Sequence, residues 1–279
     1  MVKAPASRVR VAALILSCVG LALAVSSAGV SAQALSGPVS SEAPVDALAR
    51  NMRVLATSPR KFEALIGAGR AALALGDTQA AAGFFGRAEE AHPQSPLPHV
   101  GMGAALLADG DAMGALSYFA RAKQLGANGA LMGKDRGLAY DLLGRHSEAQ
   151  EDYKAALYGP EADEARRRLA LSLAITGDKE GALVQLQPLL ARGDAAGARC
   201  RALVLALGGD VEGARRSVDV AMPGASAQMD PFLRRLPSLS STEKAAAVNL
   251  AMRQRIAERT AEVTKERLKR VYRQAHPRA

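Results

Sequence analysis

The chain has few of the residues on which catalytic and ligand-stacking sites depend. It contains no tryptophan, and aromatic residues make up only 4% of its 279 positions, so platforms on which sugars or bases could stack are scarce. Its histidines are scattered, and none has a cysteine, histidine or carboxylate at metal-ligand spacing; they are His92, His99, His146 and His276. We therefore expect no metal, no cofactor and no enzymatic activity.

Cysteine is also scarce, with only Cys18 and Cys200 in the whole chain. Cys18 lies in a segment that we expect to be removed, which leaves Cys200 without a partner for an intramolecular disulfide. Stability must then come from packing. The expected role of Cys200 is that of a small buried apolar residue.

The first 32 residues have the order of a secretory signal peptide. Three basic residues precede an apolar run over residues 11–25, and small residues end at Ala32. This order predicts cleavage before Gln33 and an exported, periplasmic protein. Two alternatives remain open, a lipoprotein modified at Cys18 and a chain retained in the inner membrane. Apolar residues continue for seven positions past Cys18, and the apolar run is shorter than the ~20 residues that cross a bilayer, which disfavours both.

The mature sequence contains a regular repeat. An alanine follows a small-residue turn by five positions in each copy: Gly76 and Ala81, Gly110 and Ala115, Gly144 and Ala149, Gly177 and Ala182, Gly209 and Ala214. Successive alanines are 34, 34, 33 and 32 residues apart. A period near ~34 residues is typical of a helix-turn-helix solenoid, in which each unit buries its apolar face against the next.

The repeat from Pro96 shows the pattern most fully. A small residue, Gly103, lies midway along the expected first helix, and Phe119 and Ala122 follow Ala115 on the second helix. Over residues 62–222 this pattern resembles the tetratricopeptide repeat (TPR), although the tryptophan of that family is absent and its final proline appears only as Pro93. The resemblance implies an all-α solenoid of about five repeats that binds proteins. An ordinary helical bundle with accidental turns is the alternative.

The segments on either side of the repeats have simpler expectations. Residues 33–61 predict a flexible lead-in followed by a capping helix, with Val45, Leu48, Met52 and Leu55 at helical spacing. Residues 223–240 form a proline-containing linker, in which Phe232 and Leu236 are candidates to cover the last repeat. With the leader and the repeats, this linker is similar to bacterial envelope proteins that carry TPRs before a peptidoglycan-binding sporulation-related (SPOR) domain. It is more weakly similar to the TPR lipoproteins of tight-adherence pilus assembly. The sequence departs from both groups, because no residues follow for such a domain and the lipobox is poor.

Residues 241–279 predict a basic C-terminal helix. Ser240 and Glu243 have the spacing of a helix N-cap, and residues 251–279 contain nine basic and three acidic side chains. The rest of the mature chain is balanced, with 24 of each sign over residues 33–250. Such a helix either carries solvated charges or binds an anionic partner, a phospholipid headgroup or an acidic cell-wall polymer. Nucleic acid is not expected for an exported chain.

The TPR resemblance also implies a binding surface, because first helices line the inner face of that family. One row of positions becomes basic and the next is apolar toward the C-terminal end. The candidate partner-binding residues are Arg70, Lys134, Leu138, Arg167, Leu171, Arg199 and Leu203. The apolar row would hold an extended peptide or a helix while the basic row pairs with acidic groups; the alternative is a row of solvated charges.

These observations favour a non-catalytic scaffold in the bacterial cell envelope, one that helps to assemble or tether a multi-protein machine. Its expected partner is a protein or peptide rather than a small-molecule substrate. The alternative function is a cell-wall or membrane-surface factor that acts through the basic C-terminal helix.

Overall fold

The computed structural model describes residues 42–252. The leader over residues 1–32 and the basic residues 253–279 lie outside this range, as does most of the lead-in. The chain divides into Met1–Gly37 and Pro38–Ala279, and all described residues belong to the second unit. Within the described range the structure is helical, and no strand is present.

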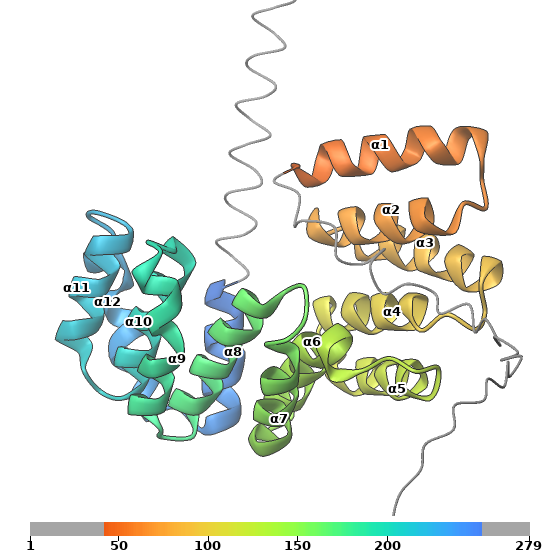
Figure 1. Cartoon of the computed structure of the whole chain (residues 1–279). Coiled ribbons are helices and arrows are strands. Elements are labelled where there is room, and N and C mark those ends of the chain that lie inside the picture. The colour runs from red at the N-terminus through yellow and green to blue at the C-terminus, as the bar shows by residue number, and fades with distance from the viewer. Residues whose placement is uncertain (1–41, 253–279) are drawn as a thin grey trace, which may run out of the picture. The chain divides into compact units, whose positions relative to one another are not determined.

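The helices follow one another as antiparallel pairs joined by short turns (Figure 1). Their bounds are α1 Pro44–Thr57, α2 Phe62–Ala74, α3 Thr78–Ala91, α4 Leu97–Ala108, α5 Ala112–Gln124, α6 Gly129–Leu142, α7 His146–Ala156, α8 Ala162–Ile175, α9 Lys179–Ala191, α10 Ala195–Leu207, α11 Val211–Ala221 and α12 Ser226–Arg235, with a 3-10 turn η2 at Leu236–Ser238. A further helix occupies residues 241–252. The five pairs from α2–α3 to α10–α11 are the five predicted repeats, so the predicted all-α solenoid is confirmed.

The turn inside each repeat explains why glycine and aspartate recur together. Gly110 has φ +93°, a left-handed conformation that glycine adopts without strain. The next amide, of Asp111, donates back to the carbonyl of Leu106 at 2.9 Å, which ends α4 as a Schellman motif. The Asp111 carboxylate then accepts from the amide of Gly114 at 2.7 Å and begins α5 as its N-cap.

The same pair of bonds recurs along the chain. The turn glycines of all five repeats have φ between 76° and 96°. Aspartates cap the second helix in four of them, Asp77, Asp111, Asp178 and Asp210. In the third repeat Arg145 replaces the aspartate and makes no side-chain cap, so this turn depends on its glycine and its backbone bonds.

Small residues let the two helices of a repeat approach closely. The five repeat alanines, from Ala81 to Ala214, have no exposed surface. A Cβ atom at Gly103 would lie 2.7 Å from Cε1 of Phe119, and one at Gly137 would lie 2.6 Å from Cε1 of Tyr153. Because real Cβ atoms do not approach so closely, these glycines make the space into which the aromatic rings of the second helices pack.

The N-terminal helix α1 covers the first repeat. Leu55 is buried and Leu48 packs beside it against the cluster that contains Phe85, whereas Val45 and Met52 are 42% and 46% exposed. Asn51 is buried instead, and its Nδ2 donates to the carbonyl of Ala47 at 2.7 Å. Two of the four apolar residues that the sequence pattern predicts to face the first repeat are therefore exposed instead.

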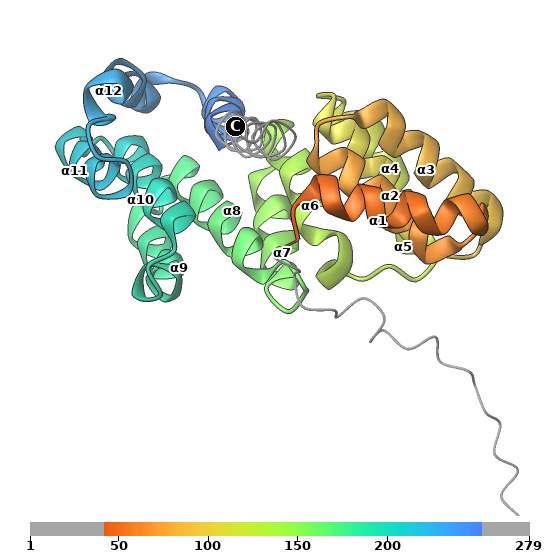
Figure 2. The ribbon, with the colours of Figure 1, turned by 90° about the horizontal axis from the view of Figure 1, so that it is seen from above.

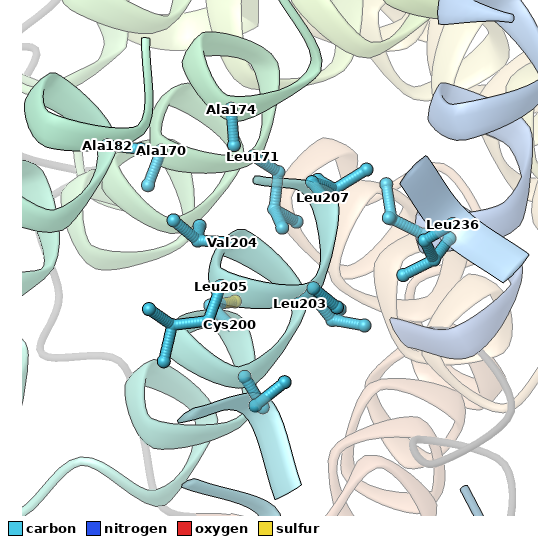
Figure 3. Packing of buried hydrophobic residues seen from close by; sticks show 14 of the residues in the cluster. Ala170, Leu171, Ala174, Ala182, Cys200, Leu203, Val204, Leu205, Leu207 and Leu236 are labelled. Atoms are coloured by element: carbon cyan, nitrogen blue, oxygen red, sulfur yellow. The ribbon is translucent and has the colours of Figure 1, made fainter. Parts of the chain in front are cut away.

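The C-terminal end of the array is sealed by residues of the linker. Leu233 and Leu236 have no exposed surface and pack with Leu203 and Leu207 of α10 in the largest apolar cluster (Figure 3). Most of this linker is helical, contrary to the expectation from its prolines. Pro231 lies inside α12, where a ten-residue helix loses one backbone bond but gains the burial of Leu233.

The turn glycines provide a direct test of this account. We expect Gly110→Ala to lower the free energy of unfolding by about 1–2 kcal/mol, because alanine is strained at a left-handed φ. Gly83 is the matched control, since it is exposed inside α3 and a Cβ there meets nothing within 4 Å. Gly83→Ala should instead stabilise by about 0.5–1 kcal/mol. Chemical denaturation of both variants measures the difference, and equal effects would contradict the proposed role of the turn.

Candidate functional site

The surface formed by the first helices of the repeats, α2, α4, α6, α8 and α10, is called the inner face here. The predicted apolar row lies on it, and its C-terminal part consists of Leu138, Leu171 and Leu203, which we call the apolar floor. Leu171 and Leu203 are only 6% and 3% exposed, and Leu138 is half-buried. Leucines at solvent-facing positions of an open groove would be exposed, so something covers them.

The cover is the helix at residues 241–252, which we call the docked helix. Ala245 and Val248 are 2% and 4% exposed and join the cluster that contains Leu171 and Leu203. At the far end of the docked helix, Sγ of Cys200 lies 3.8 Å from Sδ of Met252. Figure 2 shows the docked helix nearly end-on, on the face of α8 opposite to α9. The predicted groove is therefore partly occupied by the chain itself.

The start of the docked helix is encoded locally. The Ser240 amide donates to the Glu243 carboxylate at 2.8 Å, and the Glu243 amide donates to Oγ of Ser240 at 3.3 Å. This reciprocal arrangement is the capping box that the sequence predicts. The hydrogen bond from Ser240 also lowers the pKa of Glu243, which keeps the cap charged at neutral pH.

The predicted basic row carries carboxylates of its own. Nζ of Lys134 lies 2.9 Å from Glu161 and 3.3 Å from Asp135. Burial opposes the charge of Lys134, but these two carboxylates outweigh burial and raise the pKa of the lysine. Arg70 begins the predicted apolar row instead and is exposed. Desolvation by the surrounding protein lowers the pKa of Arg70, while Glu161 and Asp135 act in the opposite direction.

Arg167 is paired in the same way. Its guanidinium reaches Glu164 at 3.0 Å and Asp194 at 3.3 Å, and Arg168 reaches the other oxygen of Glu164 at 3.0 Å. Burial would raise the pKa of Glu164, but the two arginines reverse this effect and lower the pKa. Arg199 is half-buried on α10. Lys134 and Arg167 are thus neutralised within the chain, so the inner face is not the open basic strip that the sequence alone suggested.

Two hollows border the docked helix. A cavity of about 20 Å³ lies between it and the inner face, lined in part by Leu138, Arg168 and Asn249. A larger open cleft of about 490 Å³ lies on its other side, lined in part by Met113 and Leu250. Met113 is 64% exposed and Leu250 is 57% exposed, which leaves apolar surface available beside the docked helix.

Neither a metal-ligand cluster nor a membrane-spanning helix is found in the part of the chain that the structure describes. Over residues 42–252 no group of histidine, cysteine or acidic side chains is arranged to hold a metal ion. Within the same range no helix combines the length and hydropathy needed to span a bilayer.

Comparison with known proteins places the fold. A chain in the crystal structure of the APC/C hetero-tetramer Cut9-Hcn1 is 13% identical and superposes with a TM-score of 0.56, covering 78% of this chain and 46% of its own length. The fold is that of a TPR-like solenoid. YrrB, a TPR protein with an unusual peptide-binding site, is 21% identical and gives a TM-score of 0.44, with 66% of this chain and 94% of that chain covered. No family model and no curated protein matches the sequence.

The TPR-like array contains a buried polar network that sequence reasoning missed. The Asp141 carboxylate accepts from Oη of Tyr153 at 3.0 Å and from Oγ of Ser172 at 2.8 Å, and it lies 2.8 Å from Nδ1 of His146. Burial raises the pKa of Asp141, while the bonds from His146, Ser172 and Tyr153 act in the opposite direction. The network joins α6, α7 and α8, and Asp141 also lines the 20 Å³ cavity under the docked helix.

We expect Asp141→Ala to lower the free energy of unfolding by about 2–4 kcal/mol, because three buried polar groups lose their partner at once. Ser172→Ala removes one bond and should cost about 1 kcal/mol. Urea denaturation at pH 7 measures both variants. An Asp141→Ala cost no larger than that of Ser172→Ala would contradict a shared network.

Proposed function

We propose that this protein is a non-catalytic scaffold that holds a partner protein on the inner face of its TPR-like array. The supporting observation is the apolar floor of Leu138, Leu171 and Leu203, which is wide enough to accept a helix and has one packed on it. A helix in an apolar groove is a recurring mode of peptide recognition. An extended peptide on the same surface is the second form of ligand.

Apolar contact carries most of the proposed recognition. Lys134 and Arg167 already have carboxylate partners, so an acidic ligand has to exchange with those partners before it gains an ion pair. Such exchanges contribute little net affinity but improve specificity and the rate of association. Arg70 and Arg199 complete the charged border of the surface. In this proposal the charges orient the partner and the leucines hold it.

The proposed location is the bacterial cell envelope, on the exported side of the inner membrane. The support for this location is the N-terminal sequence, with basic residues before the apolar run at residues 11–25 and small residues up to Ala32. Lipid attachment at Cys18 and a retained inner-membrane anchor are the alternatives. Each form would hold the TPR-like array outside the cytoplasm.

Photo-crosslinking tests the proposed surface. A photoreactive amino acid at Met113, beside the docked helix, should capture a discrete partner from envelope fractions. The same residue at Val184 should not, because Val184 is 55% exposed on α9 and lines neither of the two hollows beside the docked helix. Mass spectrometry of the adducts reads out both positions. Equal capture at Val184, or no capture at Met113, would count against the inner face as the binding surface.

The alternative function is binding of an anionic wall polymer or membrane surface through residues 253–279. It is favoured by charge, since residues 253–279 contain nine basic and only three acidic side chains, an excess that would otherwise have to be explained by solvation alone.

A chain ending at Met252 separates the two functions, because it keeps the docked helix and removes only the basic residues. The scaffold proposal expects the Met113 adduct to persist in this shortened chain. The alternative expects co-sedimentation with anionic vesicles or cell-wall material that is lost on truncation and falls steeply with added salt. Loss of the Met113 adduct on truncation would favour the alternative.

A further inference from the structure

The C-terminal part of the described chain contains two elements, a fixed one formed by α12 and η2 and a separate one formed by the docked helix. Leu233 and Leu236 have no exposed surface, so α12 and η2 are integral to the core. The docked helix follows after Leu239, which has extended backbone, and begins with its own capping box at Ser240. A helix with its own start signal, joined by an extended residue to a fixed anchor, can leave the inner face while the anchor stays in place.

The packing of the docked helix is incomplete. Ala245 contributes only a methyl group to the interface, and the 20 Å³ cavity lies beside it. Oδ1 of Asn249 is buried and has no hydrogen-bond partner within residues 42–252. Leu250 faces the open cleft and is 57% exposed. A small side chain leaves space unfilled, an unpaired buried amide oxygen costs free energy, and an exposed leucine contributes no burial. The docked helix is therefore held less tightly than a well-packed helix would be.

The docked helix also shows what the inner face recognises. Ala245 and Val248, which are buried, and Met252, which is half-buried, lie at positions i, i+3 and i+7 and form one stripe of the helix. Any helix with larger apolar side chains at this spacing would fill the cavity and avoid burying an amide. The apolar floor can therefore accept a foreign helix better than its present one.

We propose that residues 241–252 are a displaceable occupant of the inner face, and that the partner is an amphipathic helix with apolar residues at the i, i+3 and i+7 spacing of Ala245, Val248 and Met252. This inference rests on the proposed scaffold function. Because the occupant is part of the same chain, it competes at a high effective concentration and lowers the apparent affinity of any partner. The partner gains access in proportion to the fraction of chains in which the docked helix is released.

Cys200 reports whether the docked helix is in place. The thiol has no exposed surface, and its sulfur lies 3.8 Å from that of Met252. It lies on α10, three residues before Leu203, and belongs to the same apolar cluster as Leu203 and Val248. Burial raises the pKa of Cys200 to about 12, so the docked state should react slowly with thiol reagents at pH 8.

The first experiment measures maleimide labelling of Cys200 at pH 8 in the full chain carrying Cys18→Ser. Val248→Asp places a charge in the apolar contact and should speed labelling at least tenfold. Ala246→Asp is the matched control, because it adds the same charge to the exposed side of the same helix and should leave labelling unchanged. Val248→Ala should be intermediate, and Asn249→Leu should label more slowly than the parent. Circular dichroism verifies that each variant is folded.

The second experiment measures binding of a fluorescein-labelled peptide of residues 240–252 to the same full-length chains. Val248→Asp should bind this peptide at least tenfold more tightly than the parent or Ala246→Asp, because its inner face is vacated. A peptide that itself carries Val248→Asp should not bind.

Unchanged Cys200 labelling across the series, or equal peptide binding by all chains, would overturn the proposal. If Val248→Asp fails to fold, the opposite shifts expected for Val248→Ala and Asn249→Leu decide the question. The scaffold function fails separately: release of the docked helix together with no partner adduct at Met113 would contradict the function and leave displacement intact. An adduct at Met113 with no effect of the helix variants would contradict displacement and leave the scaffold function intact.

Discussion

The close approach of paired helices, made possible by alanine and glycine at their contacts, is the constraint on which the whole array depends. Each repeat alanine is fully buried, and Gly103 and Gly137 leave the space that Phe119 and Tyr153 fill. A larger side chain at either glycine would collide with the ring, so the pairing tolerates little change. Because each repeat packs only on its neighbours, this local fit is repeated rather than shared across one central core.

The inner face follows from the same constraint. When alanines and aromatic residues bring two helices together, the first helix of each repeat still has a second side that no neighbouring repeat covers. In the last three repeats this side carries the apolar floor, and leaving three leucines in water would be unfavourable. The docked helix covers them, which links the repeat geometry directly to the arrangement of the C-terminal segment.

Sequence reasoning predicted the features that depend on neighbours in the chain and missed those that depend on distant contacts. The 34-residue period, the turn glycines and the Ser240–Glu243 cap depend on residues close together in the chain, and each could be predicted from the sequence. The pairing of Lys134 with Glu161 joins residues 27 positions apart, and the Asp141 network reaches 31 positions to Ser172; neither spacing has a sequence signature. Val248 and Met252 lie at helical spacing in the sequence, but this spacing does not identify the surface on which they pack.

The charges of the inner face are already paired, so they are expected to contribute little to the free energy of binding a ligand there. Lys134, Arg167 and Arg168 are matched by Asp135, Glu161, Glu164 and Asp194, so an incoming ion must break an existing pair to form a new one. Two charged groups that exchange partners change the free energy little, whereas an apolar side chain that fills a cavity adds contacts that did not exist before. Under the proposed function, the affinity of a ligand therefore depends mainly on the size and helical spacing of its apolar side chains, and a ligand has to bind the inner face more tightly than the docked helix does.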